Sequence, residues 1–537
     1  MDITHPGTPL QVLIAGIIRV FNLGCSSVEA VNHALLNPEF YLNAVYVFLT
    51  LCSFATSVFL ASYVYRKTKD KYAAILTQVP ALSFLIMPSF DSGTYPVIPV
   101  IANISAEPVF MVLMNLFNLS VMGLYFAHSK PCERRHVLFL AVICGIGLAT
   151  KINFLIILFA AFLVVPNRKK ILFALVCVAA FVFSTIPIIA KYPQLFHWIS
   201  DMVGHSSRYG TGSAAFIDWN SFLFYFKLMM STDWFFILSA LGLWTWSSFC
   251  AITERQNRAT HFVWALSLCC LLQMAATAKH FSFHYLLPAF GLFSSMLPLF
   301  YLNQKDRFKA LKPLAAGFII VFLSTCLFYT IPYYKRLSEL TRDIRQFNAK
   351  IKANYPACTV VPASTGDVDI FLNPQMVLQR ANGTNFRLEA DDLFRLYPNS
   401  YYFFSEEVTS PDPRVESYGL WNFKQRVFAD DILNSCPCAI FIKYGPDFSS
   451  YPYQVRLIDH SKYLNAYLLI NSTEKLANAL FSKAMEASKN GDFEQALMLG
   501  LKARELNYQP RGELDYILTI IYREVMKSRP SLLNQRQ

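Results

Sequence analysis

Charged side chains are scarce in this sequence. Asp, Glu, Lys and Arg make up only 15% of its 537 residues, whereas 54% of the residues are hydrophobic. This composition is too apolar for a typical soluble protein. The formal net charge is +12, but no soluble segment carries a basic stripe with interleaved aromatic residues, so we set nucleic-acid binding aside. In a membrane protein, an excess of Lys and Arg first indicates topology.

Three further signatures are missing. The twelve cysteines show no zinc-type paired spacing, and most lie in apolar runs, where cysteine behaves as a small hydrophobic residue. The first 21 residues, MDITHPGTPLQVLIAGIIRVF, lack the basic leader and the small-residue cleavage site of a signal peptide. We also find no nucleotide-binding motif. The sequence therefore points to a membrane protein without a cleaved leader.

Ten apolar segments are candidates for membrane spans. A spanning helix needs about 20 mostly apolar residues. The segments 136–149 and 152–166 are short, and the alternative is that they form one long helix. The predicted spans are residues 43–65, 72–88, 106–127, 136–149, 152–166, 170–190, 233–252, 260–278, 284–302 and 311–331.

The distribution of Lys and Arg decides between these alternatives. With ten spans, one set of loops carries 16 Lys and Arg residues and the other set carries five. Merging the short pair would put basic loops on both sides, so we keep ten spans. The positive-inside rule then places the basic set in the cytoplasm. The opposite, extracytoplasmic face receives both chain ends and Lys151, Lys279, His280 and His284.

The expected fold class is an α-helical polytopic membrane protein with a C-terminal extracytoplasmic α/β domain and a helical tail. Residues 8–23 are apolar apart from Arg19, and we expect a helix on the outer membrane surface rather than a further span. Apolar runs such as CTVVPAS, SYYFFS, CAIFIKYG and AYLLIN indicate short buried strands. The predicted limits are 1–331 for the transmembrane domain, 332–355 for a helical stalk, 356–472 for the α/β domain and 473–537 for the tail.

The C-terminal region gives two more expectations. Its segment ALFSKAMEASKNGDFEQALMLGLKARELNYQP resembles a single tetratricopeptide repeat. Such repeats need about three copies to bury a core, so we expect a helical hairpin packed on the α/β domain. An exterior compartment permits disulfides, and Cys358 can pair with Cys436 or Cys438, or all three can be free thiols.

Ionisable residues gather at the expected outer ends of the spans. Glu107 opens the third span, and Lys151 lies at the turn of the short hairpin. Taken singly, such a lysine more often snorkels to the interface, and Glu107 favours the positive end of a helix. Taken together, cations beside carboxylates can bind a phosphate head group and activate a hydroxyl. A substrate with an apolar tail and an anionic head suits this boundary.

Three short sequence motifs resemble those of polytopic GT-C glycosyltransferases. HPGTPLQVLIAGIIRVF is similar to the first exterior loop and juxtamembrane helix of the branch that includes protein O-mannosyltransferases and the lipid A aminoarabinose transferase. GIGLATKINFLIIL is similar to that branch's Gly-rich helix ending in Thr-Lys. HYLLPAF is similar to its Arg-Tyr-Leu-Leu-Pro segment, with His284 where Arg is usual. The resemblance covers about residues 1–330 and rests on the order, spacing and shared side of the motifs.

The resemblance implies a membrane glycosyltransferase of the cell envelope. Such an enzyme moves a hexosyl or pentosyl group from a polyprenyl-phosphate donor to a lipid or protein acceptor outside the membrane. The donor phosphate would be bound by Lys151, Lys279, His284 and Tyr285. The catalytic candidates are Asp2 and Glu107, and the other site candidates are His5 and His280. No cofactor is certain; a divalent cation, Mg²⁺ or Mn²⁺, stays open, without assigned ligands.

Two other functions stay open, namely a transporter or flippase and a catalytically inactive relative that acts through its exterior domain. Transporters keep ionisable residues near the middle of the membrane, whereas here they cluster at its outer edge, which favours the transferase. The family has a spanning helix and one or two acids ahead of the His-Pro pair, but Asp2 is the only acid upstream of His5. We therefore expect the gene to encode, in frame before Met1, about 20 apolar residues followed by Asp or Glu.

Overall fold

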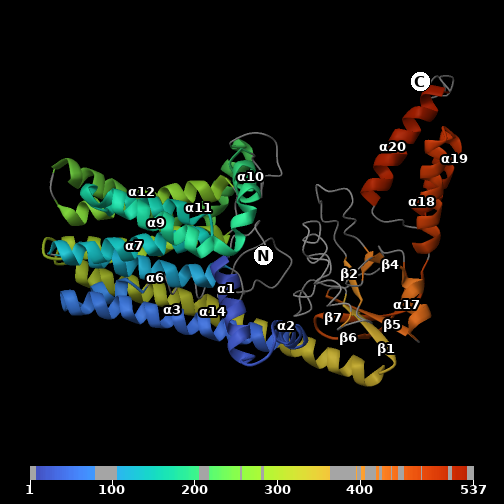
Figure 1. Ribbon diagram of the computed structural model, residues 1–537, viewed down its shortest axis with the longest axis horizontal. Coiled ribbons are helices and arrows are strands. Elements are labelled where there is room, and N and C mark those ends of the chain that lie inside the picture. The colour runs from blue at the N-terminus through green and yellow to red at the C-terminus, as the bar shows by residue number, and fades with distance from the viewer. Residues whose placement is uncertain are drawn as a thin grey trace. The chain divides into compact units, whose positions relative to one another are not determined.

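The chain divides into two compact units, Met1–Lys335 and Arg336–Gln537. Figure 1 shows helices throughout the first unit and the strands in the second. The computed structural model describes residues 8–78, 106–127, 129–204, 217–253, 257–279, 283–362, 395, 401–404, 419–421, 426–436, 438–444, 453–472, 474–505 and 511–528.

The first unit is a bundle of helices, several of them long. They are α1 (Thr8–Phe21), α2 (Ser27–Leu36), α3 (Pro38–Thr68), α4 (Lys71–Leu76), α6 (Ala106–Tyr125), α7 (Lys130–Thr150), α8 (Phe154–Val164), α9 (Lys170–Thr185), α10 (Tyr192–Gly204), α11 (Trp219–Thr253), α12 (Arg258–Lys279), α13 (Leu287–Gln304) and α14 (Leu311–Asn354). Short 3-10 helices stand between some of them, namely η2 (Asn167–Lys169), η3 (Ile186–Lys191) and η5 (Phe283–Leu286). The last helix, α14, continues into the second unit.

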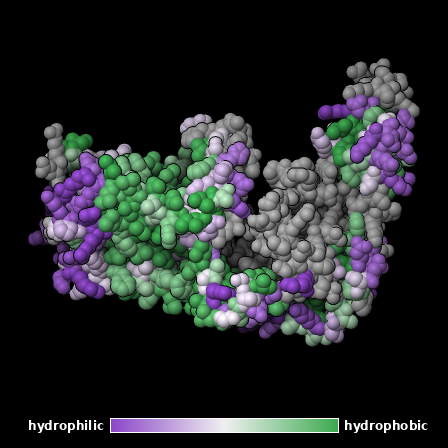
Figure 2. Space-filling view, in the orientation of Figure 1, coloured by the Kyte–Doolittle hydropathy of each residue, from purple (hydrophilic) through white to green (hydrophobic). Residues whose placement is uncertain are grey.

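Apolar side chains cover the outside of this bundle as well as its core. Fully buried Leu60, Phe117 and Phe290 belong to one core that joins several helices. On the outer surface, Ile171 and Phe183 of α9 are 78% and 77% exposed, and Figure 2 shows a broad apolar band over the unit. A helix that is apolar on both sides is typical of a membrane span. The prediction of a helical membrane protein is therefore supported.

Five helical segments in the described residues are long and apolar enough to cross a membrane. The helix α8 has only 11 residues, or about 16 Å, which is shorter than the hydrocarbon core of about 30 Å. The predicted number of ten spans is thus not established by helix length and composition. The five segments are Phe40–Thr68, Pro108–Tyr125, Asn167–His197, Phe236–Thr253 and Arg258–Lys279.

The basic loops of the sequence lie together at one end of the bundle, which we call the basic end. Polar contacts join neighbouring loops there: Lys305–Asp70 (3.0 Å), Asn257–Asn303 (2.8 Å), Arg258 to the Leu124 carbonyl (2.7 Å) and Lys169–Glu133 (2.8 Å). Since α7 begins at this end, its last residues lie at the opposite end. The predicted spans 136–149 and 152–166 are two separate helices, α7 and α8, as the charge pattern predicts.

The helix α1 lies across the starts of two other helices. Its Leu10 is buried with Val45 and Leu49 of α3, and Val109 of α6 packs against the same cluster. The N-terminal parts of α3 and α6 thus meet at this helix. A helix was predicted over 8–23 and is observed over Thr8–Phe21. The following α2, which the sequence analysis missed, begins with a capping box.

The described residues of the second unit form two small sheets. The strands are β1 (Cys358–Pro362), β2 (Tyr402–Phe404), β3 (Gly419–Trp421), β4 (Arg426–Val427), β5 (Cys438–Tyr444), β6 (Tyr453–His460) and β7 (Leu464–Ser472). One sheet has the order β1-β5-β7-β6, with only β1 and β5 parallel, and the other has the order β2-β3-β4. The predicted C-terminal sheet is therefore confirmed, and the short helix α17 (Ala429–Ser435) precedes β5.

The end of α14 forms part of this unit. Its Phe347 and Ile351 are buried with Ile440 and Ile442 of β5. Ion pairs at the rim of the same contact join Lys350 to Asp459 (2.7 Å) and Lys462 to Glu339 (3.3 Å). The segment predicted as a separate stalk is thus the end of one continuous helix that also packs on the sheet.

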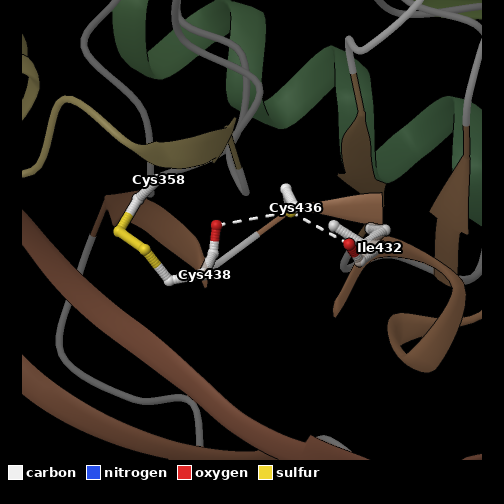
Figure 3. Close-up of a disulfide and its surroundings, with 4 residues drawn as sticks. All are labelled: Cys358, Ile432, Cys436 and Cys438. Carbon is white, nitrogen blue, oxygen red and sulfur yellow. Dashed lines mark hydrogen bonds between the residues drawn. A yellow bond between two sulfur atoms is a disulfide. The ribbon is translucent and has the colours of Figure 1, made fainter. Parts of the chain in front are cut away.

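A disulfide links the two parallel strands of the larger sheet. Cys358 and Cys438 are register partners on β1 and β5, and their sulfur atoms are bonded. The third cysteine, Cys436, is a free thiol that donates to the carbonyl groups of Ile432 and Cys438 (Figure 3). The structure therefore selects one of the pairings that the sequence left open.

The described part of the tail consists of the helices α18 (Glu474–Lys489), α19 (Phe493–Glu505) and α20 (Arg511–Ser528). Gly491, at φ +81°, makes the turn between the first two. The expected hairpin is present, but its apolar face is buried by α20, because Leu514 and Leu518 share a core with Phe481 and Ala503. Packing of the hairpin on the α/β domain stays a prediction.

Candidate functional site

Two glycines shape the turn that carries Lys151. A side-chain carbon on Gly147 would lie 2.5 Å from the ring of Phe154, and one on Gly145 would lie 2.4 Å from the Cys177 carbonyl of α9. Only glycine allows these approaches of α8 and α9 to the end of α7. The chain therefore reverses immediately after Thr150, and Lys151 stands in the turn, half-buried, with its N–H bonded to the Gly147 carbonyl.

The Lys151 ammonium lies over an aromatic ring from a distant part of the sequence. Its Nζ is 4.9 Å from the centre of the Tyr285 ring in η5. A cation at this distance is attracted by the negative face of the ring, an interaction worth about 0.5–1 kcal/mol at exposed sites and more where water is excluded. The structure thus brings together two of the residues predicted to bind a donor phosphate.

Two side chains of α12 hold the backbone of Tyr285. The Gln273 amide donates from Nε2 to the Tyr285 carbonyl at 2.9 Å, and the Thr277 hydroxyl donates to the same oxygen at 3.1 Å. Gln273 and Thr277 lie one helical turn apart and are 2% and 1% exposed. The segment η5 is therefore attached to α12 by hydrogen bonds as well as by apolar packing.

Lys279 contacts a different element. It is the last residue of α12, and its Nζ donates to the carbonyl of Val203, near the end of α10, at 2.9 Å. A cation at a helix C-terminus is favoured by the helix dipole and by the carbonyl groups that have no partner within the helix. This contact joins α10 to the end of α12.

An apolar groove begins at the Lys151 turn. Its volume is about 670 Å³, within the range of small-molecule sites. Ala149 and Ile152, on either side of the Thr150–Lys151 pair, contribute to its wall, and α8, α9 and α10 supply most of the rest. Leu155 and Val178 in this wall are 54% and 60% exposed, so the groove is accessible from the outer surface of the bundle. In a membrane, that surface faces lipid chains.

The apolar groove thus has the positive charge of Lys151 at one of its ends. Thr185 is the only hydroxyl-bearing side chain among the residues that line the groove in the described part of the chain, and it donates to the Phe181 carbonyl. Such a groove can hold a hydrocarbon chain but offers few hydrogen-bonding groups to a polar ligand. The ammonium of Lys151 can balance an anionic group attached to that chain.

The remaining predicted residues are only partly described. Glu107 stands in the first turn of α6 and His284 lies in η5, but their side chains are outside the described residues. Asp2, His5 and His280 also lie outside the described residues. Within the described part of the chain, no group of three or more His, Cys, Asp or Glu residues is arranged to hold a metal ion.

Sequence reasoning missed Gln273, Thr277 and the groove. A signal for the first two was present, because a Gln and a Thr spaced by four residues inside an apolar span occupy one helix face. No comparable signal existed for the groove, since the apolar residues that line it also fit an ordinary span. Its walls come from four helices, and their spacing depends on the two glycines of α7.

Comparisons with known proteins assign no relative to this arrangement. No family model matches the chain, and neither a curated protein nor a solved structure matches it.

Proposed function

We propose that this protein is a membrane glycosyltransferase that moves a sugar from a polyprenyl-phosphate donor to a lipid or protein acceptor. The observation that carries the proposal is that one turn of chain supplies both Lys151 and part of an apolar groove of about 670 Å³. A polyprenyl phosphate has the matching halves, a hydrocarbon chain and an anionic head. The Lys151 ammonium and the groove are held in place by neighbouring helices, which favours binding without large rearrangement.

The chemistry assigned to the site is a displacement at the anomeric carbon. The bond between that carbon and the phosphate oxygen breaks, the acceptor oxygen forms the new bond, and the electron pair of the broken bond stays on the phosphate. Lys151, with Lys279 and His284 as further candidates, balances the charge of the departing phosphate. Glu107 and Asp2 are the candidates to accept the proton of the acceptor hydroxyl.

The charge pattern supports an orientation of the protein in the membrane. The basic end, held together by contacts such as Lys305–Asp70, is assigned to the cytoplasm. Lys151 then faces outward, and so does the second unit, in which the Cys358–Cys438 disulfide suits an oxidising compartment. A reporter that is active only in the cytoplasm, fused after residue 340, should be silent. A strong signal from this fusion would overturn the assigned orientation.

Binding of the donor can be measured directly. Purified full-length protein should bind a short polyprenyl phosphate more tightly than the corresponding uncharged polyprenol. Lys151→Ala should weaken phosphate binding by about 10- to 150-fold, the usual effect of one charge-assisted contact, and leave polyprenol binding unchanged. Equal affinity of the wild type for both lipids would contradict the proposal.

The groove has a matched pair of test variants. Ala174→Trp on α9 fills space in the wall of the groove, whereas Leu175→Trp adds the same ring next to it, at a position outside that wall. Only the first variant should weaken binding of both lipids. If both variants bind like the wild type, the groove does not hold the chain.

Activity is tested in cells. A strain without the gene should lose one sugar from its surface glycolipids or glycoproteins, and the Lys151→Ala variant should not restore it. An unchanged surface composition would contradict the transferase. Accumulation of the complete lipid-linked sugar on the cytoplasmic side would instead indicate a flippase.

A further inference from the structure

Gln273 is an unusual residue for its place in the fold. It lies in the interior of α12, an apolar span, and is only 2% exposed. Burying an amide costs free energy unless it is hydrogen-bonded. Its Nε2 donates to Tyr285, but its Oε1 is buried without a hydrogen-bond partner among the described residues. The residue therefore uses the donor end of its amide, and that end is directed to the backbone of the η5 segment.

Thr277 repeats the same contact from the next turn of the helix. Its hydroxyl is within 3.1 Å of the Tyr285 carbonyl and within 2.8 Å of the Gln273 carbonyl of its own helix. A hydroxyl carries one hydrogen and so shares it between the two oxygens. Two buried donors thus converge on one backbone oxygen, in a short 3-10 segment whose own helical bonds are few.

The position of the Tyr285 ring depends on this attachment. The backbone of Tyr285 is fixed by α12, whereas Lys151 comes from the end of α7. Their contact at 4.9 Å joins two elements that are 134 positions apart in the sequence. If η5 were released from α12, the ring could move away from the ammonium without any change in α7.

We infer that Gln273 and Thr277 are positioning residues, which hold the Tyr285 ring against the Lys151 ammonium and so fix the charge that receives the anionic head of the lipid. The part of this inference that concerns the lipid rests on the proposed function. The part that concerns the Lys151–Tyr285 pair does not, and it can be tested without a ligand.

The ligand-free test measures the reactivity of Lys151. Full-length protein is treated with a limiting amount of acetic anhydride, and acetylation of Lys151 is quantified by mass spectrometry relative to the exposed Lys309. Tyr285→Leu should raise the relative rate about two- to fivefold, since it removes the cation–π contact. Thr277→Val and Gln273→Leu should each raise it in the same direction, and Thr277→Ser, which keeps the hydroxyl, should restore the wild-type rate.

The test of mechanism is non-additivity. In the Tyr285→Leu background, Thr277→Val and Gln273→Leu should add nothing further, because the ring through which they act is gone. Ser267→Ala is the matched control, since this buried hydroxyl on the same helix donates only within α12 in the described contacts. An additive effect in the Tyr285→Leu background, an unchanged rate in both single variants, or an equal rise in Ser267→Ala would overturn the inference.

The same variants test the link to the ligand. In phosphatidylcholine vesicles that contain a short polyprenyl phosphate, Thr277→Val should weaken binding when Tyr285 is present and have no effect in the Tyr285→Leu background. A wild type that does not bind the lipid counts against the proposed function, while the acetylation result still decides the positioning role. Binding by the wild type with an equal loss in both backgrounds would overturn the positioning role alone.

Discussion

At the basic end of the helical unit, cations meet carboxylates, whereas at the opposite end Lys151 meets a ring and Lys279 meets a backbone carbonyl. The Lys305–Asp70 and Lys169–Glu133 distances are 3.0 and 2.8 Å, and both carboxylate side chains are largely buried. Those pairs cancel charge and join loops. The Lys151–Tyr285 and Lys279–Val203 contacts instead hold each ammonium against a ring face or a carbonyl oxygen. Cations of the same kind thus form ion pairs that link loops at one end, whereas at the other end our proposal assigns them to an anion site.

The largest expected effect is on stability at the basic end. Asp70 accepts from the backbone at the start of α4 and also pairs with Lys305. Asp70→Ala removes both contacts and should lower the free energy of unfolding by about 2–4 kcal/mol, visible as a lower melting temperature in detergent. Asp70→Asn keeps a side chain that can cap the helix and should lose less. Equal melting temperatures for the alanine variant and the wild type would contradict a stabilising role of the Asp70 contacts.

Variants at the two ends should differ in whether they affect stability or lipid binding. Lys151→Ala should change the free energy of unfolding by less than about 1 kcal/mol, because only a half-buried cation–π contact is lost. Asp70→Asn should leave the affinity for a polyprenyl phosphate within about twofold of the wild type, as a local change at the far end of the bundle is expected to do. If Lys151→Ala and Asp70→Asn lower stability equally and weaken binding equally, the two ends do not have different roles.

The dependence of stability on pH should also differ between the ends. For Asp70, burial acts to raise the pKa, but the hydrogen bonds from Lys305 and from the backbone of Ala73 and Tyr72 outweigh it, so the pKa lies below its ordinary value of 3.8. The ionised form therefore stabilises the fold above that ordinary value, and this contribution is lost as the pH falls from 3.8 through the folded value. Melting curves between pH 6 and pH 3 should show a smaller acid loss for Asp70→Asn than for the wild type. Parallel curves would show that the Asp70 pair does not contribute to the pH dependence of stability.

The smallest expected effect concerns Glu133. Burial acts to raise its pKa, but hydrogen bonds from Lys169 and Arg168 outweigh it and hold the pKa below 4.5. The Arg168 side chain is 56% exposed, so solvent screens its pair strongly. Glu133→Gln should cost about 0.5–1 kcal/mol, and added salt should reduce the difference in melting temperature from the wild type. A loss as large as that of Asp70→Ala would mean that the Lys169–Glu133 pair, whose side chains are 13% and 12% exposed, contributes as much as the Asp70 contacts.

Much of the fold could be predicted because apolar helices and loop charges are local features of the sequence. The separation of α7 and α8 followed from Lys and Arg counts alone, although α8 is too short to satisfy a span by itself. The segment between the predicted spans 170–190 and 233–252 contains α10 and the first turns of α11. Its aromatic and polar residues form helices by packing at the end of the bundle, and a hydropathy pattern does not record such packing.

The candidate site was predicted only in part. Lys151 and Tyr285 were both selected from motifs, but their contact needs η5 and the end of α7 to meet, which no local pattern specifies. Gln273 and Thr277 were overlooked because a polar residue in an apolar span has no evident partner until the fold is known. The pairing of Cys358 with Cys438 was open for the same reason, since it depends on the parallel register of β1 and β5.

The sequence by itself determined the apolar, helical character of the first unit, the shared end of its basic loops and the presence of strands in the second unit. These properties follow from composition, hydropathy and charge, which act over a few neighbouring residues. Only the tertiary structure decided which groups meet. These are Lys151 and the Tyr285 ring, the Gln273 and Thr277 donors at the Tyr285 carbonyl, and the helices that line the groove. Such contacts join elements that are distant in the sequence, and they depend on how closely those elements pack, as α8 and α9 do against Gly147 and Gly145.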